Sequence, residues 1–511
     1  MMKNYTTTFF MRGMALCGLA LSVLLSSCSK DDDDDYRNDS EIVAPNVNVT
    51  ALLQNNRIAS FNAQTSGALT QTLSITGMQT GENMLAIDYR PATGELYGVS
   101  SGSRIYIINP STGAARAVSA TPFTPAIDGT AIGIDFNPTV DRLRLVSNNG
   151  QNLRLNPEDG TALRDGDING AAGAKISSVA YTENYAGASS TVLFDIDLTN
   201  KKLYKQDPPN NGTLVEVGSL GVDASAVGDF DITPDSKSAL AALTVNGTQG
   251  LYSIDMSNGK AYKAYSFNTN IVGLAIFTNP VAYAVSGNNE LLIFNPASIS
   301  PVAKAISGVQ ANEQILGIDF RPLNGRLYGL GSSNRLYTIN PSSGVATAVS
   351  GAQFSTALSG TSFGFDFNPV ADLIRVVSNT GQNLRISPVT GDIAGVDTQL
   401  PANTGFVNAA AYTNNFPGAT STVLFTINSQ TGKLYKQDPP NAGTMTEIGS
   451  LGITITEANG FDISSNTGNA YGIFTVAGTT RFYGINLQTG AVSAGVSFPQ
   501  GTRGFALGLG F

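Results

Sequence analysis

Aspartates recur at one position of a repeated strand-like pattern, and carboxylates are the side chains of this chain best suited to chemistry. In the segment 133–137 (GIDFN), an aspartate alternates with apolar residues. A pair of carboxylates in different environments can serve as general acid and as nucleophile or base in sugar hydrolysis. The pattern is therefore compatible with a hydrolase of the glycosidase or lactonase type, which would work through carboxylates on the innermost strands of a repeated sheet. The aspartates concerned are Asp88, Asp135, Asp231, Asp319, Asp366 and Asp462.

The same aspartates also suit a structural role at the interface between neighbouring units. A buried carboxylate must be paired or hydrogen-bonded. The repeats supply arginines as candidate partners, namely Arg90, Arg104, Arg144, Arg154, Arg321, Arg335, Arg375 and Arg385. A scaffold role recurs in every unit, whereas a catalytic pair needs two unlike environments. We therefore favour the structural interpretation and a non-catalytic protein, and keep the enzyme as the alternative.

Two polar segments, each present twice, are the candidate ligand-binding residues. The segment 147–154 (SNNGQNLR) contains an Asn-Gly pair typical of a hairpin tip, and 205–210 (KQDPPN) reads as a loop. Polar residues carried on loops are better functional candidates than core positions. The competing interpretation for both segments is a structural one, in which they form turns and hydrogen bonds between neighbouring repeat units (interblade hydrogen bonds). The candidates are Gln151, Asn152, Arg154, Lys205, Gln206 and Asp207, with their copies Gln382, Asn383, Arg385, Lys436, Gln437 and Asp438.

Several residue types are absent, and their absence excludes whole classes of chemistry. The chain has no histidine and no tryptophan, so it has no imidazole base, no Ser-His-Asp triad and no histidine metal ligand. Residues 165–170 (DGDING) resemble the first half of a calcium loop, but position 12 is Ile176 instead of a bidentate glutamate. We expect no metal and no cofactor.

The N-terminus predicts export and lipid attachment. Lys3 and Arg12 precede an apolar run, and 25–28 (LSSC) resembles the lipobox of bacterial lipoproteins. The resemblance implies cleavage after residue 27, acylation of Cys28, and an outer-membrane lipoprotein of the bacterial cell envelope. Residues 28–48 then form an acidic tether, and Ser29–Asp35 in it also resembles an export signal for the cell surface. The only other cysteine, Cys17, lies in the signal, so no disulfide is expected.

The second half of the chain repeats the first at an offset of 231 residues, and each half divides into about five smaller units. Residues 202–221 and 433–452 are identical at 16 of 20 positions. Units such as 84–113 and 131–160 alternate with period two and are punctuated by N-P-x-x-G turns. Four strands in about 46 residues match the blade of a β-propeller. The segments 271–277 and 503–511 supply the innermost strand that the first unit of each half lacks.

We therefore predict an all-β chain of about ten four-stranded blades. The favoured arrangement is two tandem five-bladed propellers, over 49–277 and 281–511, and one ten-bladed ring is the alternative. A solenoid or a pair of β-sandwiches is less favoured.

Motifs spread over both halves resemble the Domain of Unknown Function 4394 family of bacterial secreted or envelope-associated proteins. They include LAIDYRPATGELYGVSSGSRIYIINPSTG, GFDFNPVADLIRVVSNTGQNLR and KLYKQDPPN. The resemblance covers nearly the whole chain after the tether and implies a propeller-like fold, but no activity, substrate or site residue.

The favoured function is a lipid-anchored binding scaffold for a glycan, a peptide or an envelope protein. The chain is acidic, with a formal charge of −9 and no basic cluster, which argues against nucleic acid. Apart from its lipid, nothing in the sequence predicts insertion into the membrane.

Overall fold

The computed structural model describes residues 43–65, 68–402 and 406–511. The expected signal peptide, the lipidated Cys28 and most of the acidic tether lie outside the described residues. No helix among the described residues is long and apolar enough to cross a membrane.

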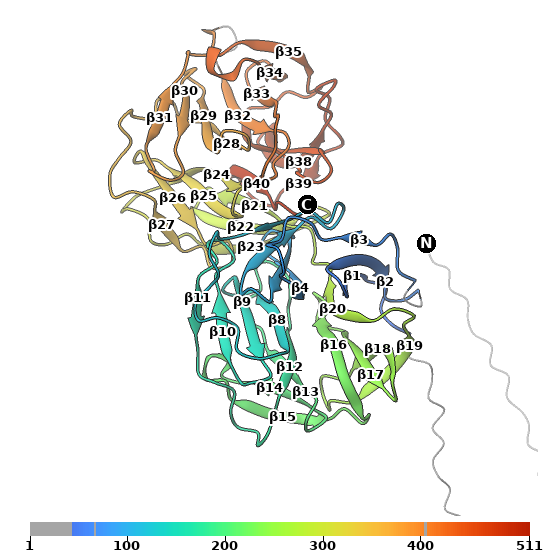
Figure 1. The fold of residues 1–511 in the computed structure, drawn as a ribbon. Coiled ribbons are helices and arrows are strands. Elements are labelled where there is room, and N and C mark those ends of the chain that lie inside the picture. Colours follow the sequence, from blue (N-terminus) through green and yellow to red (C-terminus); the bar gives the residue numbers. More distant parts are fainter. Residues whose placement is uncertain (1–42, 66–67, 403–405) are drawn as a thin grey trace, which may run out of the picture. The chain divides into compact units, whose positions relative to one another are not determined.

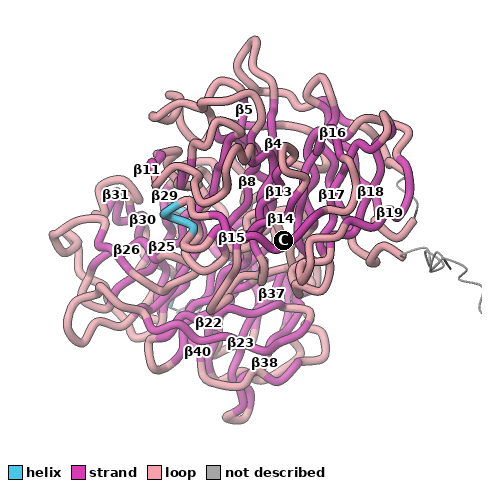
Figure 2. Tube along the Cα trace, turned by 90° about the horizontal axis from the view of Figure 1, so that it is seen from below, coloured by secondary structure: helices cyan, strands magenta, loops and turns pink. Residues whose placement is uncertain are grey.

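The described chain is built from strands. Figure 2 shows nearly all regular structure in magenta, as strands. The strands form ten antiparallel sheets of four strands each, as the sequence predicts. Two short 3-10 helices, η1 (Pro209–Asn211) and η3 (Pro440–Ala442), follow the same strand in the two halves.

The first half contains five sheets, each of which runs from an innermost strand outward. They are β20 (Ile271–Ile276), β1 (Asn48–Leu53), β2 (Arg57–Asn62) and β3 (Leu73–Ser74); β4 (Met84–Tyr89), β5 (Leu96–Ser100), β6 (Ile105–Ile108) and β7 (Ala115–Ala117); β8 (Ile132–Asn137), β9 (Arg142–Ser147), β10 (Asn152–Leu155) and β11 (Ala162–Arg164); β12 (Ile176–Tyr181), β13 (Leu193–Asp197), β14 (Lys202–Gln206) and β15 (Leu214–Ser219); and β16 (Ala224–Ile232), β17 (Ala239–Val245), β18 (Thr248–Ile254) and β19 (Ala261–Ser266).

The second half repeats this order in five further sheets. They are β40 (Thr502–Leu507), β21 (Ala282–Ser286), β22 (Glu290–Asn295) and β23 (Ser298–Ala305); β24 (Ile315–Arg321), β25 (Arg326–Gly331), β26 (Arg335–Ile339) and β27 (Ala346–Ala348); β28 (Phe363–Asn368), β29 (Leu373–Ser378), β30 (Asn383–Ile386) and β31 (Ile393–Val396); β32 (Val407–Tyr412), β33 (Leu424–Asn428), β34 (Lys433–Gln437) and β35 (Met445–Ser450); and β36 (Glu457–Ile463), β37 (Ala470–Val476), β38 (Thr479–Ile485) and β39 (Val496–Ser497).

The last strand of each half completes the first sheet of that half. β20 pairs antiparallel with β1, and β40 pairs antiparallel with β21, which confirms the predicted closing strands. Innermost strands contact one another in the cyclic order β4, β8, β12, β16, β20, and likewise β24, β28, β32, β36, β40. Figure 1 shows the strands of each half as a separate group. The two closed cycles favour two five-bladed rings, and we interpret each half as a five-bladed propeller.

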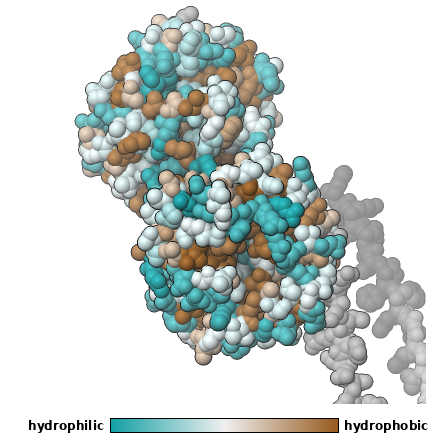
Figure 3. All heavy atoms as spheres, in the orientation of Figure 1, coloured by the Kyte–Doolittle hydropathy of each residue, from teal (hydrophilic) through white to brown (hydrophobic). Residues whose placement is uncertain are grey.

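The cores lie between neighbouring sheets. One cluster joins Tyr97 and Val99 of β5 to Phe136 of β8 and Leu145 of β9. The rings of Tyr97 and Phe136 meet edge to face with centroids 5.2 Å apart, a favourable aromatic geometry. On the face drawn in Figure 3, hydrophilic and hydrophobic residues are intermixed over both halves.

Close approach of the innermost strands demands glycine at the centre of each half. A Cβ on Gly133 of β8 would lie 2.5 Å from Ser178 Cα of β12, and one on Gly460 of β36 would lie 2.3 Å from Phe505 Cβ of β40. Neither contact is tolerable without a shift of the chain. The strands are therefore packed backbone to backbone near the centre of the cycle.

Candidate functional site

Three aspartates of each half meet at the centre of its cycle of strands. Asp88, Asp135 and Asp231 come from β4, β8 and β16, at the same position of each innermost strand. One carboxylate oxygen of each lies within 4.8 Å of those of the other two. Their exposed fractions are only 1–2%. The second half brings Asp319, Asp366 and Asp462 together in the same way.

Each axial aspartate links its strand to the next innermost strand. Asp88 Oδ2 accepts a hydrogen bond from the Phe136 amide of β8 at 2.8 Å. Asp231 Oδ2 accepts one from the Ile276 amide of β20 at 2.6 Å. In the second half, Phe367 donates to Asp319 and Leu507 donates to Asp462. The aspartates therefore join neighbouring sheets by hydrogen bonds, as the structural interpretation of the sequence predicts.

The partners of these aspartates differ from the expected arginines. The aspartates take backbone amides, whereas Arg90 pairs with Asp141, and Arg104 with Glu82. In the other cases Arg144 and Arg154 share Asp165, Arg321 pairs with Asp372, and Arg375 and Arg385 share Asp397. The buried Arg335 Nε and Nη1 have no hydrogen-bond partner among the described residues. The prediction of arginine partners was wrong because the axial strands lie so close that backbone amides reach the carboxylates first.

Burial perturbs the ionisation of the axial carboxylates. Desolvation first, and the Asp88 carboxylate second, raise the pKa of Asp135 well above its usual range. Desolvation likewise raises the pKa of Asp231 to about 7, although bonds from the Ile276 and Ile232 amides lower it. Like charges this close cannot all ionise without compensation.

This geometry does not suit a glycosidase. Carboxyl groups of retaining and inverting enzymes lie about 5 to 9.5 Å apart on either side of a sugar, whereas these oxygens lie within 4.8 Å of one another. The void beside Gly364 and Gly460, at the centre of the second half, measures about 10 Å³. That volume is near the minimum for one water molecule, so a sugar has no room there.

The first half carries a fourth buried carboxylate in the adjacent layer. Asp229 accepts hydrogen bonds from Ser178 Oγ at 2.6 Å, from the Phe230 amide and from the Leu274 amide of β20. Desolvation raises the pKa of Asp229 to about 7. The second half has Gly460 and Ala409 in place of Asp229 and Ser178.

Arg144 organises a polar network where the two predicted ligand segments meet. Its guanidinium donates to Asn152 Oδ1 at 2.8 Å, to Asp165 Oδ2 at 2.7 Å and to Asn210 Oδ1 at 2.7 Å. Arg375 makes the same bonds to Asn383, Asp397 and Asn441. The segments 147–154 and 205–210 thus lie side by side and are tied together.

Most of the predicted ligand-binding amides are used inside this network. Asn152 Nδ2 donates to the Gly166 and Pro209 carbonyls, and Gln206 Nε2 donates to the Pro209 carbonyl. Gln151 bridges the Ala126 carbonyl and the Asp128 amide. The corresponding bonds of Gln382, Asn383 and Gln437 have the same role. These positions therefore favour structural hydrogen bonding, within a loop or between blades, over contact with a ligand.

The other candidates keep polar atoms accessible. Arg154 is 31% exposed at its side chain while it pairs with Asp165. Lys205 lies over the Phe194 ring, 5.6 Å from its centroid, and Asp207 is exposed. In the second half Arg385 pairs with Asp397, and Lys436 with Asp438.

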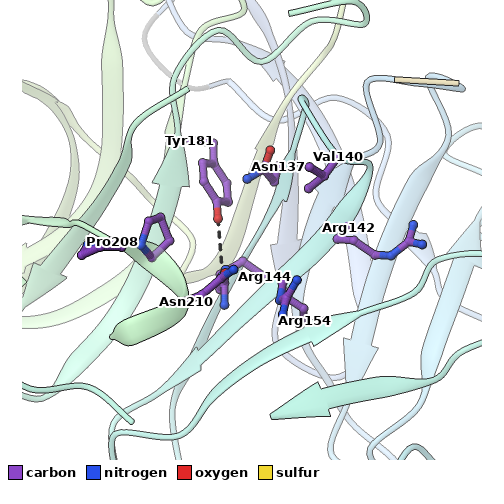
Figure 4. A pocket seen from close by; sticks show the side chains of 9 residues that line it. Asn137, Val140, Arg142, Arg144, Arg154, Tyr181, Pro208 and Asn210 are labelled. Carbon is purple, nitrogen blue, oxygen red and sulfur yellow. Dashed lines mark hydrogen bonds between the residues drawn. The ribbon is translucent and has the colours of Figure 1, made fainter. Parts of the chain in front are cut away.

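A pocket of about 210 Å³ opens beside the Arg144 network. Figure 4 shows Arg154 and Asn210 below the Tyr181 ring, Pro208 at one side, and Arg142 at the edge with its guanidinium directed away from Tyr181. The Tyr181 hydroxyl lies 3.3 Å from Arg144 Nε. Arg142 donates to the Asp141 carbonyl and forms no ion pair among the described residues.

The pocket therefore has an excess of positive charge. Arg144 and Arg154 share the single carboxylate of Asp165, and Arg142 adds a third guanidinium. The second half has Leu373 at the position of Arg142. The calcium-loop resemblance finds no support in this arrangement, since Asp165 and Asp167 are both paired with arginines.

A family model described as "Domain of unknown function (DUF4394)" matches residues 57–275 and 290–507. The chain belongs to this family. The two matches confirm the two tandem copies expected from the sequence, and the family description names no activity. No curated protein matches the chain.

Three of the solved structures that match this DUF4394 chain have low sequence identity and TM-scores of 0.30 or less. A structural genomics protein of unknown function from Bacteroides thetaiotaomicron VPI-5482 is 12% identical over 79% of this chain and 96% of its own, with a TM-score of 0.30. Virginiamycin B lyase from Staphylococcus aureus is 13% identical over 68% and 91%, with a TM-score of 0.23. A chain of a nidogen/laminin complex is 10% identical over 62% and 92%, with a TM-score of 0.26.

Reasoning from the sequence missed Arg142, Asn210 and Asp229. The signal for Arg142 and Asp229 is a difference between the two halves of the DUF4394 chain, where Leu373 and Gly460 stand instead. Asn210 lies at the end of a segment that the sequence did single out.

Proposed function

We propose that this protein is a non-catalytic binding scaffold whose first half binds a small anionic ligand in the Arg142–Arg144–Arg154 pocket. The observation that carries the proposal is the charge imbalance there, since three arginines line the pocket and two of them, Arg144 and Arg154, share one carboxylate, Asp165. Arginine guanidiniums recognise carboxylate, sulfate and phosphate oxygens through charge-assisted hydrogen bonds.

The size of the pocket supports a ligand no larger than a sugar ring. Pockets for drug-sized ligands usually span roughly 300–1,000 Å³, and this one has about 210 Å³. Tyr181, Pro208 and Val140 add apolar surface next to the arginines. A sugar that bears a carboxylate or a sulfate group combines the required charge with a ring that packs on such surface.

The proposed setting is the bacterial cell envelope. The sequence of residues 1–28 supports a lipid anchor at Cys28, and an anchored scaffold meets acidic glycans and envelope proteins at a membrane surface. The proposal of an outer-membrane lipoprotein rests on that sequence.

The proposal is tested by binding of uronic acids against their neutral counterparts. Isothermal titration of the chain from Glu41 onward with glucuronate and galacturonate, each compared with glucose and galactose, measures the contribution of the carboxylate. We expect binding of the acids only. A charge-assisted hydrogen bond contributes about 1.5–3 kcal/mol, so R142L should weaken binding about tenfold or more.

The second half supplies a matched control for this variant. Leu373 occupies the corresponding position of β29, so leucine is compatible with the blade and R142L should leave the melting temperature unchanged. The reciprocal L373R should add a weaker second site. Equal binding of neutral and acidic sugars, or unchanged affinity in R142L, would refute the proposal.

A further inference from the structure

The centre of each half holds a cluster of buried carboxylates with no lysine or arginine side chain among the described residues paired to them. In the first half, Asp88, Asp135, Asp229 and Asp231 are all 1–4% exposed. None of them forms an ion pair with a lysine or arginine of the described chain. Buried carboxylates that lack a paired charge either take up protons or coordinate a metal ion.

The Asp135 carboxylate has a buried oxygen with no partner. Asp135 is 1% exposed, and its Oδ1 accepts no hydrogen bond from any described residue. Asp135 belongs to the set of three whose oxygens converge at the axis. A buried polar atom that is left unsatisfied is costly, and an ion or ordered water is the usual explanation.

The spacing of the converging oxygens suits a calcium ion. Ca²⁺ binds oxygens at about 2.3–2.6 Å, so any two of its ligands lie at most about 5.2 Å apart. The axial oxygens lie within 4.8 Å of one another. Mg²⁺ binds at about 2.0–2.1 Å, brings opposite ligands to about 4.2 Å and keeps several waters. The three aspartates are only 1–2% exposed, so the flexible coordination of Ca²⁺ suits this buried site better than the strict octahedron of Mg²⁺ with its several waters.

We propose that each half binds one divalent cation, with Ca²⁺ the best fit, on its axis between three aspartates. The ligands are Asp88, Asp135 and Asp231 in the first half, and Asp319, Asp366 and Asp462 in the second. This proposal departs from the expectation of a metal-free chain, which considered the 165–170 loop and not the axial positions.

The cation has a clear structural role. The aspartates come from three of the five innermost strands of each half, and the other two innermost strands carry alanine at this position, namely Ala180 and Ala275 or Ala411 and Ala506. One ion therefore contacts strands that are far apart in the chain and stabilises the closed cycle. Binding to the folded state alone raises the melting temperature in proportion to the logarithm of ion concentration.

The first measurement is the metal content of the full mature chain by plasma mass spectrometry, followed by thermal unfolding after EDTA treatment. We expect about two metal ions per chain before treatment. After EDTA, 1 mM Ca²⁺ should raise the melting temperature by about 5 °C or more if it exceeds Kd a hundredfold, and Mg²⁺ should raise it less.

The variants separate the two sites. Asp135→Asn should reduce the content to one ion per chain, Asp366→Asn should do the same, and the double variant should retain none. Ser178→Ala with Asp229→Gly copies the second half and leaves all six ligands, so it should keep two ions. A wild-type chain with less than one metal ion per ten chains, or with no response to Ca²⁺ after EDTA treatment, would overturn the proposal, whatever the variants do. Binding of uronic acids at the arginine pocket is independent of this result.

Discussion

Stability should fall as the pH rises from 5 to 8, because of Asp229. Desolvation raises the pKa of Asp229 from 3.8 to about 7 in the folded chain. The folded state therefore holds a proton that the unfolded state has released. This contribution is fully present below pH about 4 and is lost as the pH rises through 7. The chain has no histidine, so no imidazole titrates in this window.

The size of the effect follows from the two pKa values. Each pKa unit is worth about 1.4 kcal/mol. Integration between pH 5 and pH 8 for a group that titrates near 7 in the fold and near 4 in the unfolded chain gives about 3 kcal/mol. For a unit of about 230 residues, this corresponds to about 6–12 °C in melting temperature.

The matched variant is Ser178→Ala with Asp229→Gly, which places the second half's Ala409 and Gly460 in the first half. Asp231 and Asp462 titrate in both proteins, so the difference between the two curves reports Asp229 together with the rise in the pKa of Asp231 that the Asp229 charge causes. Thermal unfolding is followed by circular dichroism at pH 5, 6, 7 and 8, with EDTA present throughout so that no cation holds the axial carboxylates ionised. The wild type should lose about 6–12 °C more than the variant across this range. Parallel curves, or a wild-type curve that rises with pH, would show that Asp229 is ionised in the fold and refute the reasoning.

Three further predictions concern the packing of the axis, the lipid anchor and export to the cell surface. Gly460→Ala places a Cβ 2.3 Å from Phe505 Cβ and should lower the free energy of unfolding by about 1–3 kcal/mol. The control is Gly287→Ala, which has nothing within 4 Å of its Cβ and should change the melting temperature little. Equal effects of the two variants would contradict the close approach at the axis. Cys28→Ser in the full precursor, expressed in a Gram-negative host, should abolish labelling by palmitate and release the protein from the membrane fraction, and a variant that stays lipidated would rule out Cys28 as the anchor. Replacement of Asp31–Asp35 by alanine should reduce protease accessibility on whole cells if these residues direct surface export.

The architecture could be predicted because the chain repeats itself on two scales. Turns such as 109–113 and 156–160 place glycine where φ is positive, and Gly113 and Gly160 have φ of 75° and 74°. The hairpin tip predicted at Asn149-Gly150 is also present, with Gly150 at φ 85°. Local turn chemistry and period-two alternation are readable in a single sequence, so the four-stranded sheets and their closing strands were predictable.

The site was harder to predict, because its key contacts join residues that the sequence does not associate. Asp88 accepts a hydrogen bond from a backbone amide 48 residues away. Every residue except proline has such an amide, so the residue types in the sequence do not indicate this partner. The expected arginines have the right charge for a carboxylate, but residue types alone give no distance. Asn152 and Gln206 look like surface polar residues in the sequence and become buried linkers once Arg144 and Asn210 meet across two sheets.

Comparison of the halves offers a stronger argument about function than either half alone. Features that both halves share, such as the axial aspartates and the Arg144 and Arg375 networks, fit a role in building the five-sheet cycle or, for the aspartates, in the proposed ion site. Features present in one half only are free of that requirement. Three of them lie in the first half, namely Arg142, Asp229 and Asp195. The equivalent positions of the second half hold Leu373, Gly460 and Thr426.

Each of these differences adds an ionisable side chain to the first half. Asp195 is fully buried between sheets, and neither of its oxygens has a hydrogen-bond partner among the described residues. Desolvation raises its pKa well above the usual range, while the Arg144 charge lowers it. A duplicated scaffold has no structural need for such costly groups in one copy, since the other copy packs without them. The asymmetry therefore supports the proposal that the ligand site lies in the first half.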